Sequence, residues 1–348
     1  MSDVESRKPL VIVFIGGESG EHDISLKSGA AVIRNLPSAG FQAMPVLIGQ
    51  DGSFGFPPPE DPTRFTHSVG IGEAVYKMAS MNPACAFIAM HGTFGEDGRV
   101  QALCDLMHIP HVGSDVTGSA VSMDKWLTKT IFRDAGIPTP DAVLEGALDT
   151  AEDTDGLVER VEDRIGLPCV VKTTRLGSSL GVGIAGNPDE LERLVQDARG
   201  FGGVMLEAFH PGREMTVSVL EDPDTGEPEA LPVIEIIPSD ESKFFDQKSK
   251  YGLGVTQADE ICPADIPDSL AARVGELAVM AHRALMLSGF SRTDFMVDDE
   301  GVWALETNSI PGLTEVSLFP KAAEAAGIGF SELVGRLVRR AMSGPKSR

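Results

Sequence analysis

The stretch LVIVFIGGESGEHDISLKSGAAVIRNL (residues 10–36) decides the fold class. Its apolar run Leu10–Ile15 predicts a buried strand, the glycines that follow predict a turn, and a helix is expected from Ser25 to Leu36. Further short strands are expected at Ala43–Ile48 and Cys85–Met90, separated by segments with helical patterns. Strands and helices that alternate in this way predict an α/β domain with a parallel sheet covered by helices.

Length and charge narrow the class of protein. The chain has 348 residues, and domains of about 150 residues are typical, so two or three domains are expected. Subtracting 52 acidic from 29 basic residues leaves a net charge of −23. Such a surface repels phosphate backbones and anionic lipids, which argues against nucleic-acid and membrane partners. The apolar run at residues 10–15 is too short for a membrane helix and is read as a strand rather than a signal peptide.

The cysteines point to a reducing compartment. Cys85, Cys104, Cys169 and Cys262 are widely scattered and have apolar neighbours. Their spacing fits neither a zinc site nor a disulfide framework, so buried reduced thiols and a cytoplasmic location are expected.

Two further units follow the N-terminal one. The strands LPCVVKTT (167–174) and GVGIA (181–185) fall in the first of them. After Glu207 the pattern changes to a series of longer strands and helices, which indicates another unit. The expected domains are therefore residues 1–113, 114–207 and 208–348.

The stretch SRTDFMVDDEGVWALETN (291–308) predicts a β-hairpin that carries a metal site. A three-residue loop at 299–301 would pair Asp298 with Val302 and, stepping back by twos, Asp294 with Glu306 and Arg292 with Asn308. Two ionised carboxylates that face each other repel, and a divalent cation removes that repulsion. The oxygens of Asp294, Glu306 and Asn308 are hard ligands suited to Mg²⁺. The alternative is a surface hairpin with one ion pair.

The stretch LPCVVKTTRLGSSLGVGIA (167–185) predicts a site for phosphate. Lys172 ends a buried strand, and backbone amides in the following Gly/Ser turn could cradle a phosphate group. The spacing matches neither the P-loop nor the dinucleotide-binding fingerprint, which removes the main support for those two classes. A plain hairpin turn is the alternative.

Two acidic and histidine-bearing turns follow strands of the predicted parallel sheet. Glu21 follows the first strand, and His91 follows the strand CAFIAM (85–90). Open α/β sheets bind their ligands at the carboxyl ends of the strands, so both side chains are candidates for a binding site. Ordinary capping or surface roles are the alternative.

Eight motifs together resemble the ordered signature of the D-alanine–D-alanine ligases, which are ATP-grasp carboxylate–amine ligases. They cover most of the chain from about residue 10 to residue 342, and their order as well as their content carries the resemblance. The motifs are GGESGEHDISLKSG (16–29), HGTFGEDG (91–98), SMDK (122–125), LPCVVKTTRLGSSLGV (167–182), LEAFHPGRE (206–214), KSKY (248–251), RTDFMV (292–297) and LETNSIPGLTEVSLFPKAAEAAG (305–327).

The resemblance implies a three-domain α/β ATP-grasp architecture with an N-terminal parallel-sheet domain and ATP between the other two domains. It implies that the nucleotide is bound by residues from the central and C-terminal units: Lys125, Lys172 and Lys250 at the phosphates, Glu207 with Ala208 and His210 at the adenine, and Glu214 at the ribose. It also implies that two Mg²⁺ ions, or Mn²⁺ in their place, are held by Asp294, Glu306 and Asn308.

For the two D-alanine substrates the resemblance implies a second set of residues. Glu21 would anchor the ammonium of the first D-alanine, in a hydrogen-bonded set with Ser178 and Tyr251. Ser317 would bind the carboxylate of the second, while Arg292 and the amide of Gly312 would stabilise the tetrahedral intermediate. The product would supply peptidoglycan precursors, and a homodimer is expected.

Some features of the chain depart from the family pattern. Ala208 and His210 replace a longer polar and an aliphatic residue beside adenine, and Gln247 replaces an aromatic residue in the loop that is expected to act as a lid (about 239–259). Related ligases that use D-lactate or D-serine as the second substrate remain alternatives. A non-catalytic nucleotide-binding regulator is a third, against which the intact set of Asp294, Glu306 and Asn308 argues.

Overall fold

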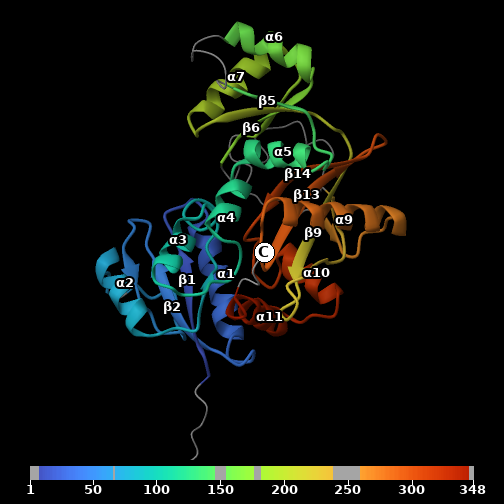
Figure 1. Cartoon of the computed structure of the whole chain (residues 1–348). Helices are drawn as coiled ribbons and strands as arrows, with labels where there is room; N and C mark the ends of the chain where they lie inside the picture. Colours follow the sequence, from blue (N-terminus) through green and yellow to red (C-terminus); the bar gives the residue numbers. More distant parts are fainter. Residues whose placement is uncertain (1–7, 66, 146–153, 176–181, 238–258, 345–348) are drawn as a thin grey trace, which may run out of the picture.

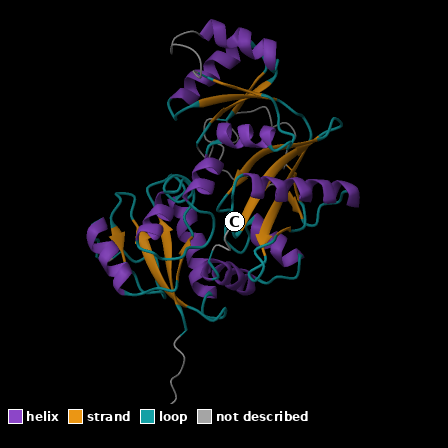
Figure 2. Cartoon of the chain, in the orientation of Figure 1, coloured by secondary structure: helices purple, strands orange, loops and turns teal. Residues whose placement is uncertain are grey.

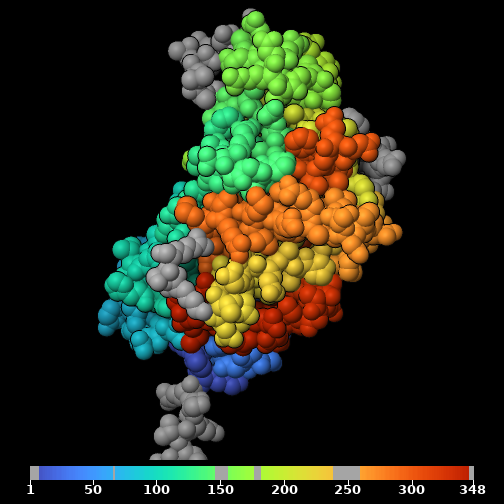
Figure 3. Space-filling view, turned by 45° about the vertical axis from the view of Figure 1, so that its right-hand side comes forward, coloured from blue at the N-terminus to red at the C-terminus, as the bar shows by residue number. Residues whose placement is uncertain are grey.

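The computed structural model describes residues 8–65, 67–145, 154–175, 182–237 and 259–344. Three sheets, each with its own helices, follow one another along the chain. In Figure 1 the N-terminal sheet lies at the lower left, the central sheet at the top, and the third sheet to the right between them. The central unit projects from the rest in the space-filling view (Figure 3).

The N-terminal sheet is the predicted parallel sheet. Its strand order is β3-β2-β1-β4, in which β1 pairs in parallel with both neighbours, while the short edge strand β3 is antiparallel. The strands β1 and β4 read as continuous apolar runs because both of their faces are covered. The elements are β1 (Leu10–Gly16), α1 (His22–Asn35), β2 (Gln42–Ile48), β3 (Phe54–Gly55), α2 (Ile71–Ser80), β4 (Cys85–Ile88) and α3 (Arg99–Leu106). Helix α1 begins three residues before the expected Ser25.

The central sheet is antiparallel, with the order β5-β8-β6-β7. Helices α6 and α7 pack on its outer face, so the opposite face is turned toward the third sheet (Figure 1). Leu191, Leu194 and Val195 of α7 are buried at the spacing of one helical face. The elements are β5 (Ala142–Leu144), α6 (Thr154–Arg164), β6 (Cys169–Thr173), β7 (Gly183–Ala185), α7 (Pro188–Arg199) and β8 (Val204–Ala208).

The third sheet is also antiparallel and carries the predicted hairpin. Its order is β12-β11-β9-β13-β14, with β10 paired to β9, and helices pack against this sheet as they do against the N-terminal sheet (Figure 2). Its elements are β9 (Arg213–Glu221), β10 (Pro228–Ala230), β11 (Ile234–Ile237), β12 (Asp259–Ile261), α9 (Asp268–Ala284), β13 (Phe290–Val297), β14 (Val302–Asn308), α10 (Leu318–Ala325) and α11 (Phe330–Met342). Helix α11 packs back on α1 and β4, so the two ends of the described chain share one core.

Two helices connect the N-terminal sheet to the central one. Helix α4 (Val116–Met123) ends directly before α5 (Lys125–Asp134), and Asp124 separates them with an extended backbone. The carboxylate of Asp124 accepts hydrogen bonds from the amides of Trp126 and Leu127, which makes it the N-cap of α5. Lys125 therefore stands at the first position of a helix, beside the third sheet.

The hairpin of β13 and β14 confirms one part of its prediction and corrects another. Asp294 lies opposite Glu306 and Arg292 opposite Asn308, as predicted. The loop prediction was wrong, because Val297 rather than Asp298 lies opposite Val302. A bulge between these two regions adds one residue, Leu305, to β14 and restores the pairing at the acids.

The cysteines agree with the expectation of free thiols. All four are unpaired; Cys85, Cys104 and Cys169 are buried, and Cys262 is half-buried. Burial raises the pKa of Cys169 to about 12, so this thiol stays protonated and inert. Among the described helices, none has both the length and the apolar character needed to cross a membrane.

Candidate active site

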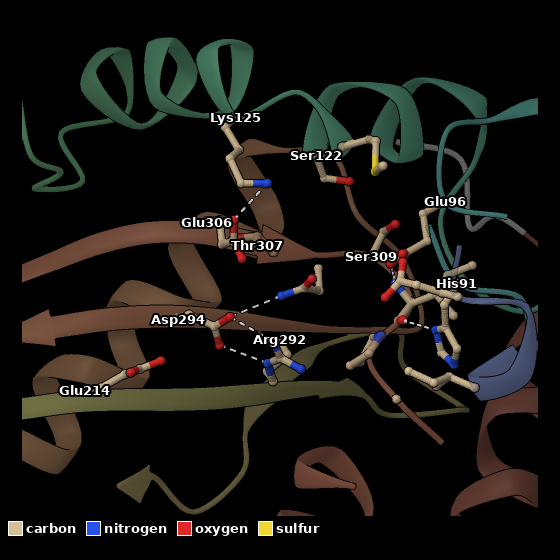
Figure 4. A pocket seen from close by; sticks show the side chains of 17 residues that line it. His91, Glu96, Ser122, Lys125, Glu214, Arg292, Asp294, Glu306, Thr307 and Ser309 are labelled. Atoms are coloured by element: carbon tan, nitrogen blue, oxygen red, sulfur yellow. Dashed lines mark hydrogen bonds and ion pairs between the residues drawn. The ribbon is translucent and has the colours of Figure 1, made fainter. Parts of the chain in front are cut away.

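A polar cavity of about 350 Å³ lies where the N-terminal unit, the α4–α5 junction and the third sheet meet (Figure 4). It brings together segments that are nearly 300 residues apart in the sequence. Predicted residues that line it are Glu21, His91, Lys125, Glu214, Arg292, Asp294, Glu306, Asn308 and Gly312.

Asp294 lies at the centre of a hydrogen-bonded set on the sheet floor of this cavity. Its Oδ1 accepts hydrogen bonds from the Thr216 hydroxyl at 2.5 Å and from Arg292 Nε at 2.8 Å. Its Oδ2 accepts from Arg292 Nη2 at 2.7 Å and from the Asn308 side-chain amide at 3.2 Å. Burial opposes the charge of Arg292, but Asp294 raises the pKa of the guanidinium further above its usual range. The carboxylate and the guanidinium therefore form a charged, two-pronged pair.

Glu306 faces the same cavity from the neighbouring strand. Its carboxylate forms an ion pair with Lys125, with 3.0 Å between Nζ and Oε2. Burial opposes the charge of Glu306, but Lys125 and Lys172 lower the pKa of Glu306 to about 2. Two ionised carboxylates and an amide oxygen thus come from adjacent strands, and this donor set fits a hard divalent cation such as Mg²⁺.

The N-terminal wall of the cavity is built around His91. Its Nδ1 lies 3.2 Å from the carbonyl oxygen of Ile310, and its Nε2 lies 2.9 Å from the Ser28 hydroxyl. Burial lowers the pKa of His91, so the neutral imidazole donates from Nδ1 and accepts at Nε2. The ring thereby joins the N-terminal unit to the loop that follows β14.

Glu96 makes a second connection to the same loop. Its carboxyl group accepts hydrogen bonds from the amides of Gly92 at 2.6 Å and Ile310 at 3.3 Å. Burial raises the pKa of Glu96 to about 8, which favours the neutral acid near pH 7.

Gly312 and Ser317 lie together beyond this loop. A Cβ atom at Gly312 would come within 2.9 Å of the Ser317 hydroxyl oxygen, so a larger residue here would force the Ser317 side chain to shift. The Ser317 hydroxyl accepts a hydrogen bond from the Thr314 amide at 3.2 Å and lies 2.7 Å from the Thr314 hydroxyl. Gly312 lines the cavity, and the Ser317 hydroxyl lies directly beside it.

Lys172 and Glu207 lie on the neighbouring central strands β6 and β8. Lys172 Nζ is 2.7 Å from Glu207 Oε1, and both side chains are buried. The other carboxylate oxygen of Glu207 contacts Lys129, which is fully buried. Burial opposes ionisation, but the two lysines lower the pKa of Glu207, so a carboxylate is held between two ammonium groups.

Family models match two segments that together span most of the chain: D-ala D-ala ligase N-terminus at residues 10–114 and D-ala D-ala ligase C-terminus at residues 131–339. The D-alanine--D-alanine ligase of Desulforudis audaxviator is 40% identical to this chain over 332 residues, which are 94% of this chain and 97% of that protein. The chain belongs to the D-alanine–D-alanine ligase family.

Solved structures agree with this assignment. VanG D-Ala:D-Ser ligase from Enterococcus faecalis matches with a TM-score of 0.80 at 26% identity, over 96% of this chain and 100% of that one. D-alanine--D-alanine ligase from Bacillus anthracis, complexed with ATP, matches with a TM-score of 0.75 at 27% identity, over 96% of this chain and 98% of that one. The predicted α/β ATP-grasp fold is thereby confirmed.

In this ligase two of the residues that depart from the family pattern, Ala208 and His210, lie between the central and third sheets, where β8 ends and before β9 begins. Ala208 ends β8, and its amide donates to the carbonyl of Asp141 at 2.8 Å. His210 lies 2.9 Å, through Nδ1, from Asp298 Oδ2 and stacks on Trp303 with 4.2 Å between ring centroids. His210 is thus directed at the tip of the hairpin and does not line the described cavity.

Several predicted residues of the ligase lie outside the described part of the chain. These are Ser178, Lys250 and Tyr251, together with nearly all of the expected lid segment. Their predicted roles stay predictions.

Two ionisable residues were missed by the sequence analysis: the half-buried Glu96, which lines the cavity, and the fully buried Lys129 of α5. Glu96 stands in the motif HGTFGEDG, whose acidic residues were not separated by function. Lys129 follows Lys125 by one helical turn, on the face of α5 that also buries Phe132. A lysine at a buried helical position was the signal that could have found it, because such a lysine needs an acidic partner.

Proposed function

We propose that this chain ligates two D-alanines to D-alanyl-D-alanine, with conversion of ATP to ADP and inorganic phosphate, and so supplies peptidoglycan precursors. The observation that supports this proposal best is the pair of opposed carboxylates, Asp294 and Glu306. The pair faces the same cavity as Glu21, Arg292 and Gly312. This arrangement supports a site for phosphoryl transfer beside groups suited to amino-acid recognition.

The nucleotide is bound between the central and third sheets in this proposal. Lys125, Lys172 and Lys250 bind its phosphates, Glu214 binds the ribose, and the segment with Glu207, Ala208 and His210 borders the adenine. Asp294, Glu306 and Asn308 would hold two Mg²⁺ ions, or Mn²⁺, which would neutralise charge on the transferring phosphate. The opposed carboxylates are the feature that supports this assignment.

The reaction begins with attack on ATP by the carboxylate of the first D-alanine. An oxygen of that carboxylate bonds to the γ-phosphorus, the bond to the β-phosphate oxygen breaks, and ADP leaves. The resulting acyl phosphate is an acyl donor with a good leaving group. The amine of the second D-alanine then bonds to the acyl carbon, and loss of a proton and of inorganic phosphate gives the dipeptide.

The protein's own groups position the two amino acids. Glu21, with Ser178 and Tyr251, anchors the ammonium of the first D-alanine, and Ser317 binds the carboxylate of the second. Arg292 and the amide of Gly312 stabilise the oxyanion of the tetrahedral intermediate, an interaction that typically contributes about 10²–10³ in rate. The approach of Gly312 to Ser317 supports a shared site for the carboxylate and the oxyanion.

A ligase with D-serine or D-lactate as second substrate is the competing assignment. One of the matching solved structures is a D-Ala:D-Ser ligase. A panel of D- and L-amino acids and hydroxy acids with ATP and Mg²⁺ tests the choice. The proposal expects D-alanyl-D-alanine as the main product by mass, with one phosphate released per dipeptide. A mixed dipeptide or a depsipeptide as the main product would contradict it. If the protein binds ATP but turns over none of these substrates, a non-catalytic nucleotide-binding regulator is favoured instead.

The larger organisation is part of the same proposal. We infer three domains with boundaries near residues 113 and 207, a cytoplasmic location and a homodimer without nucleic-acid or membrane partners. Sedimentation equilibrium measures the mass of the particle, and a monomer at micromolar concentration would contradict the homodimer.

A further inference from the structure

Lys129 is the most deeply buried cation of the molecule's described part. It is fully buried on α5, and its ammonium contacts the carboxylate of Glu207, the Thr139 hydroxyl at 2.7 Å and the carbonyl oxygen of Pro140 at 3.1 Å. An ammonium taken out of water needs such partners to remain charged. None of the roles assigned above to the nucleotide site uses this lysine.

The position of Lys129 is fixed from the third sheet. The Thr139 hydroxyl donates to the carbonyl oxygen of Ala304 at 2.7 Å, and the Ala304 amide donates to the carbonyl of Pro138 at 2.8 Å. Ala304 lies two positions before Glu306 on β14. The ammonium is therefore anchored to the strand that carries the acid site, while its ionic partner belongs to the central sheet.

The charges around Glu207 indicate how Lys129 could affect the nucleotide. One carboxylate serves two ammonium groups, so the group of three side chains carries a net charge of +1. Without Lys129, Glu207 would pair with Lys172 alone, and the net charge at this end of the cleft would be zero. Opposite charges at hydrogen-bond distance in a buried site attract strongly, so Lys172 would also be held more firmly away from a phosphate.

We propose that Lys129 is a positioning residue for ATP: it shares the charge of Glu207 and so leaves Lys172 available to the nucleotide phosphates. The inference rests on the proposed function only in that the ligand is ATP. The role acts through Glu207, and Lys129 itself need not touch the nucleotide.

Calorimetric titration of the full-length protein tests this role, with Mg-ATP and, separately, with adenosine, in the absence of D-alanine. The variant Lys129→Met should bind ATP about ten-fold more weakly, because the net charge falls from +1 to zero. Adenosine carries no phosphate, so the same variant should bind adenosine within about three-fold of the parent protein. Lys129→Arg keeps the charge and should bind ATP more tightly than Lys129→Met does.

The comparison of the two ligands decides between charge and packing. If Lys129→Met loses as much affinity for adenosine as for ATP, Lys129 acts through packing and the inference is overturned. If Lys129→Met does not fold, the neutral and polar variant Lys129→Gln takes its place, and ATP affinity equal to that of the parent would overturn the inference. Because no D-alanine is present, this ranking stands apart from ligase activity: a protein that ranks as expected but makes no dipeptide refutes the proposed function alone.

Discussion

Asp294 and Glu306 are opposite each other with both carboxylates ionised, and cations on either side compensate them. Arg292 binds Asp294 through two nitrogens, and Lys125 pairs with Glu306. Side chains so arranged can exchange these partners for a divalent cation and phosphate oxygens when the nucleotide binds. The metal prediction therefore depends on individual charges, which single substitutions can remove.

Glu306→Gln should reduce turnover by about 10²-fold or more while the protein stays folded, because it removes one ligand charge at nearly constant volume. The assay is phosphate release at a series of Mg²⁺ concentrations, with circular dichroism as the check on folding. Glu300→Gln is the matched control, since Glu300 is exposed on the loop of the same hairpin. Parent-like activity of Glu306→Gln at low Mg²⁺ would contradict the metal assignment.

At this scale the sequence predicted residue types better than their partners. The structure brings Glu21, Arg292 and the set of Asp294, Glu306 and Asn308 to one cavity. Each of these residues stands in a short motif that the sequence alone singles out. The partnership of Glu207 with Lys129 and Lys172 was not predicted, since it joins a helix to two strands that are 35 or more residues away in the sequence. Local spacing contains no information about which distant charge a buried carboxylate meets.

Helix α5 places Lys125 at the cavity, and its start is set by Asp124. The Asp124 carboxylate caps the helix and also accepts a hydrogen bond from Arg175 Nε at 2.7 Å. Lys125 follows at once, and its amide donates to the carbonyl of Thr174 at 2.8 Å. The cap therefore determines both where the helix begins and where the lysine stands.

Asp124→Ala should lower stability by about 1 kcal/mol, because two amides at the helix start lose their acceptor. Asp124→Asn keeps an acceptor oxygen for those amides and should lose clearly less. Urea unfolding followed by circular dichroism measures both losses. Equal losses in the two variants would show that the ion pair with Arg175, rather than the cap, determines the effect.

The hairpin of β13 and β14 shows what periodicity can and cannot give for an element. Alternation along each strand predicted the pairing of Asp294 with Glu306 correctly. The predicted loop was wrong by one residue. The bulge at Leu305 adds one residue to β14 between the loop and the acidic pair, so the pairing of Asp294 with Glu306 is nevertheless as predicted. A bulge adds a residue without changing composition or apolar pattern, so the sequence carries no clear signal for it.

A buried polar network connects elements of the third sheet with the last helix. Glu221 of β9 lies 3.3 Å from His282 of α9 and accepts a hydrogen bond from Arg340 of α11 at 2.7 Å. Burial opposes its charge, but His282 and Arg340 lower the pKa of Glu221 to about 2 from an ordinary value of 4.5. Its folded state therefore binds fewer protons than the unfolded chain between these values.

The sign of the pH effect follows. The stabilisation from Glu221 is fully present above pH 4.5 and is lost as the pH falls toward 2. In Glu221→Gln this acid-sensitive part should be absent, so the urea midpoint should change less between pH 5 and pH 3 than in the parent. Glu227→Gln, which breaks an exposed pair with Arg283, is the control and should keep the parent's slope. An unchanged slope in Glu221→Gln would contradict the role of this network.

For the whole molecule the sequence predicted the parts more firmly than their arrangement. Strand–helix alternation predicted the N-terminal parallel sheet, because that signal is local and repeated. It did not predict that α11 packs on α1 and β4, or that His91 meets Ile310 across the cavity. These contacts join segments more than 200 residues apart, and neither the local patterns nor the resemblance to a known family gave an expectation about them.

The central claim is that the carboxylate of the first D-alanine takes the γ-phosphoryl group of ATP. D-Alanine labelled with ¹⁸O in both carboxylate oxygens tests this most directly, with mass spectrometry of the released phosphate and of the dipeptide. The account predicts one ¹⁸O in each inorganic phosphate, because the carboxylate oxygen that attacks phosphorus leaves with it when the amine bonds to the acyl carbon. Phosphate without ¹⁸O, or ¹⁸O found in AMP, would contradict the acyl phosphate.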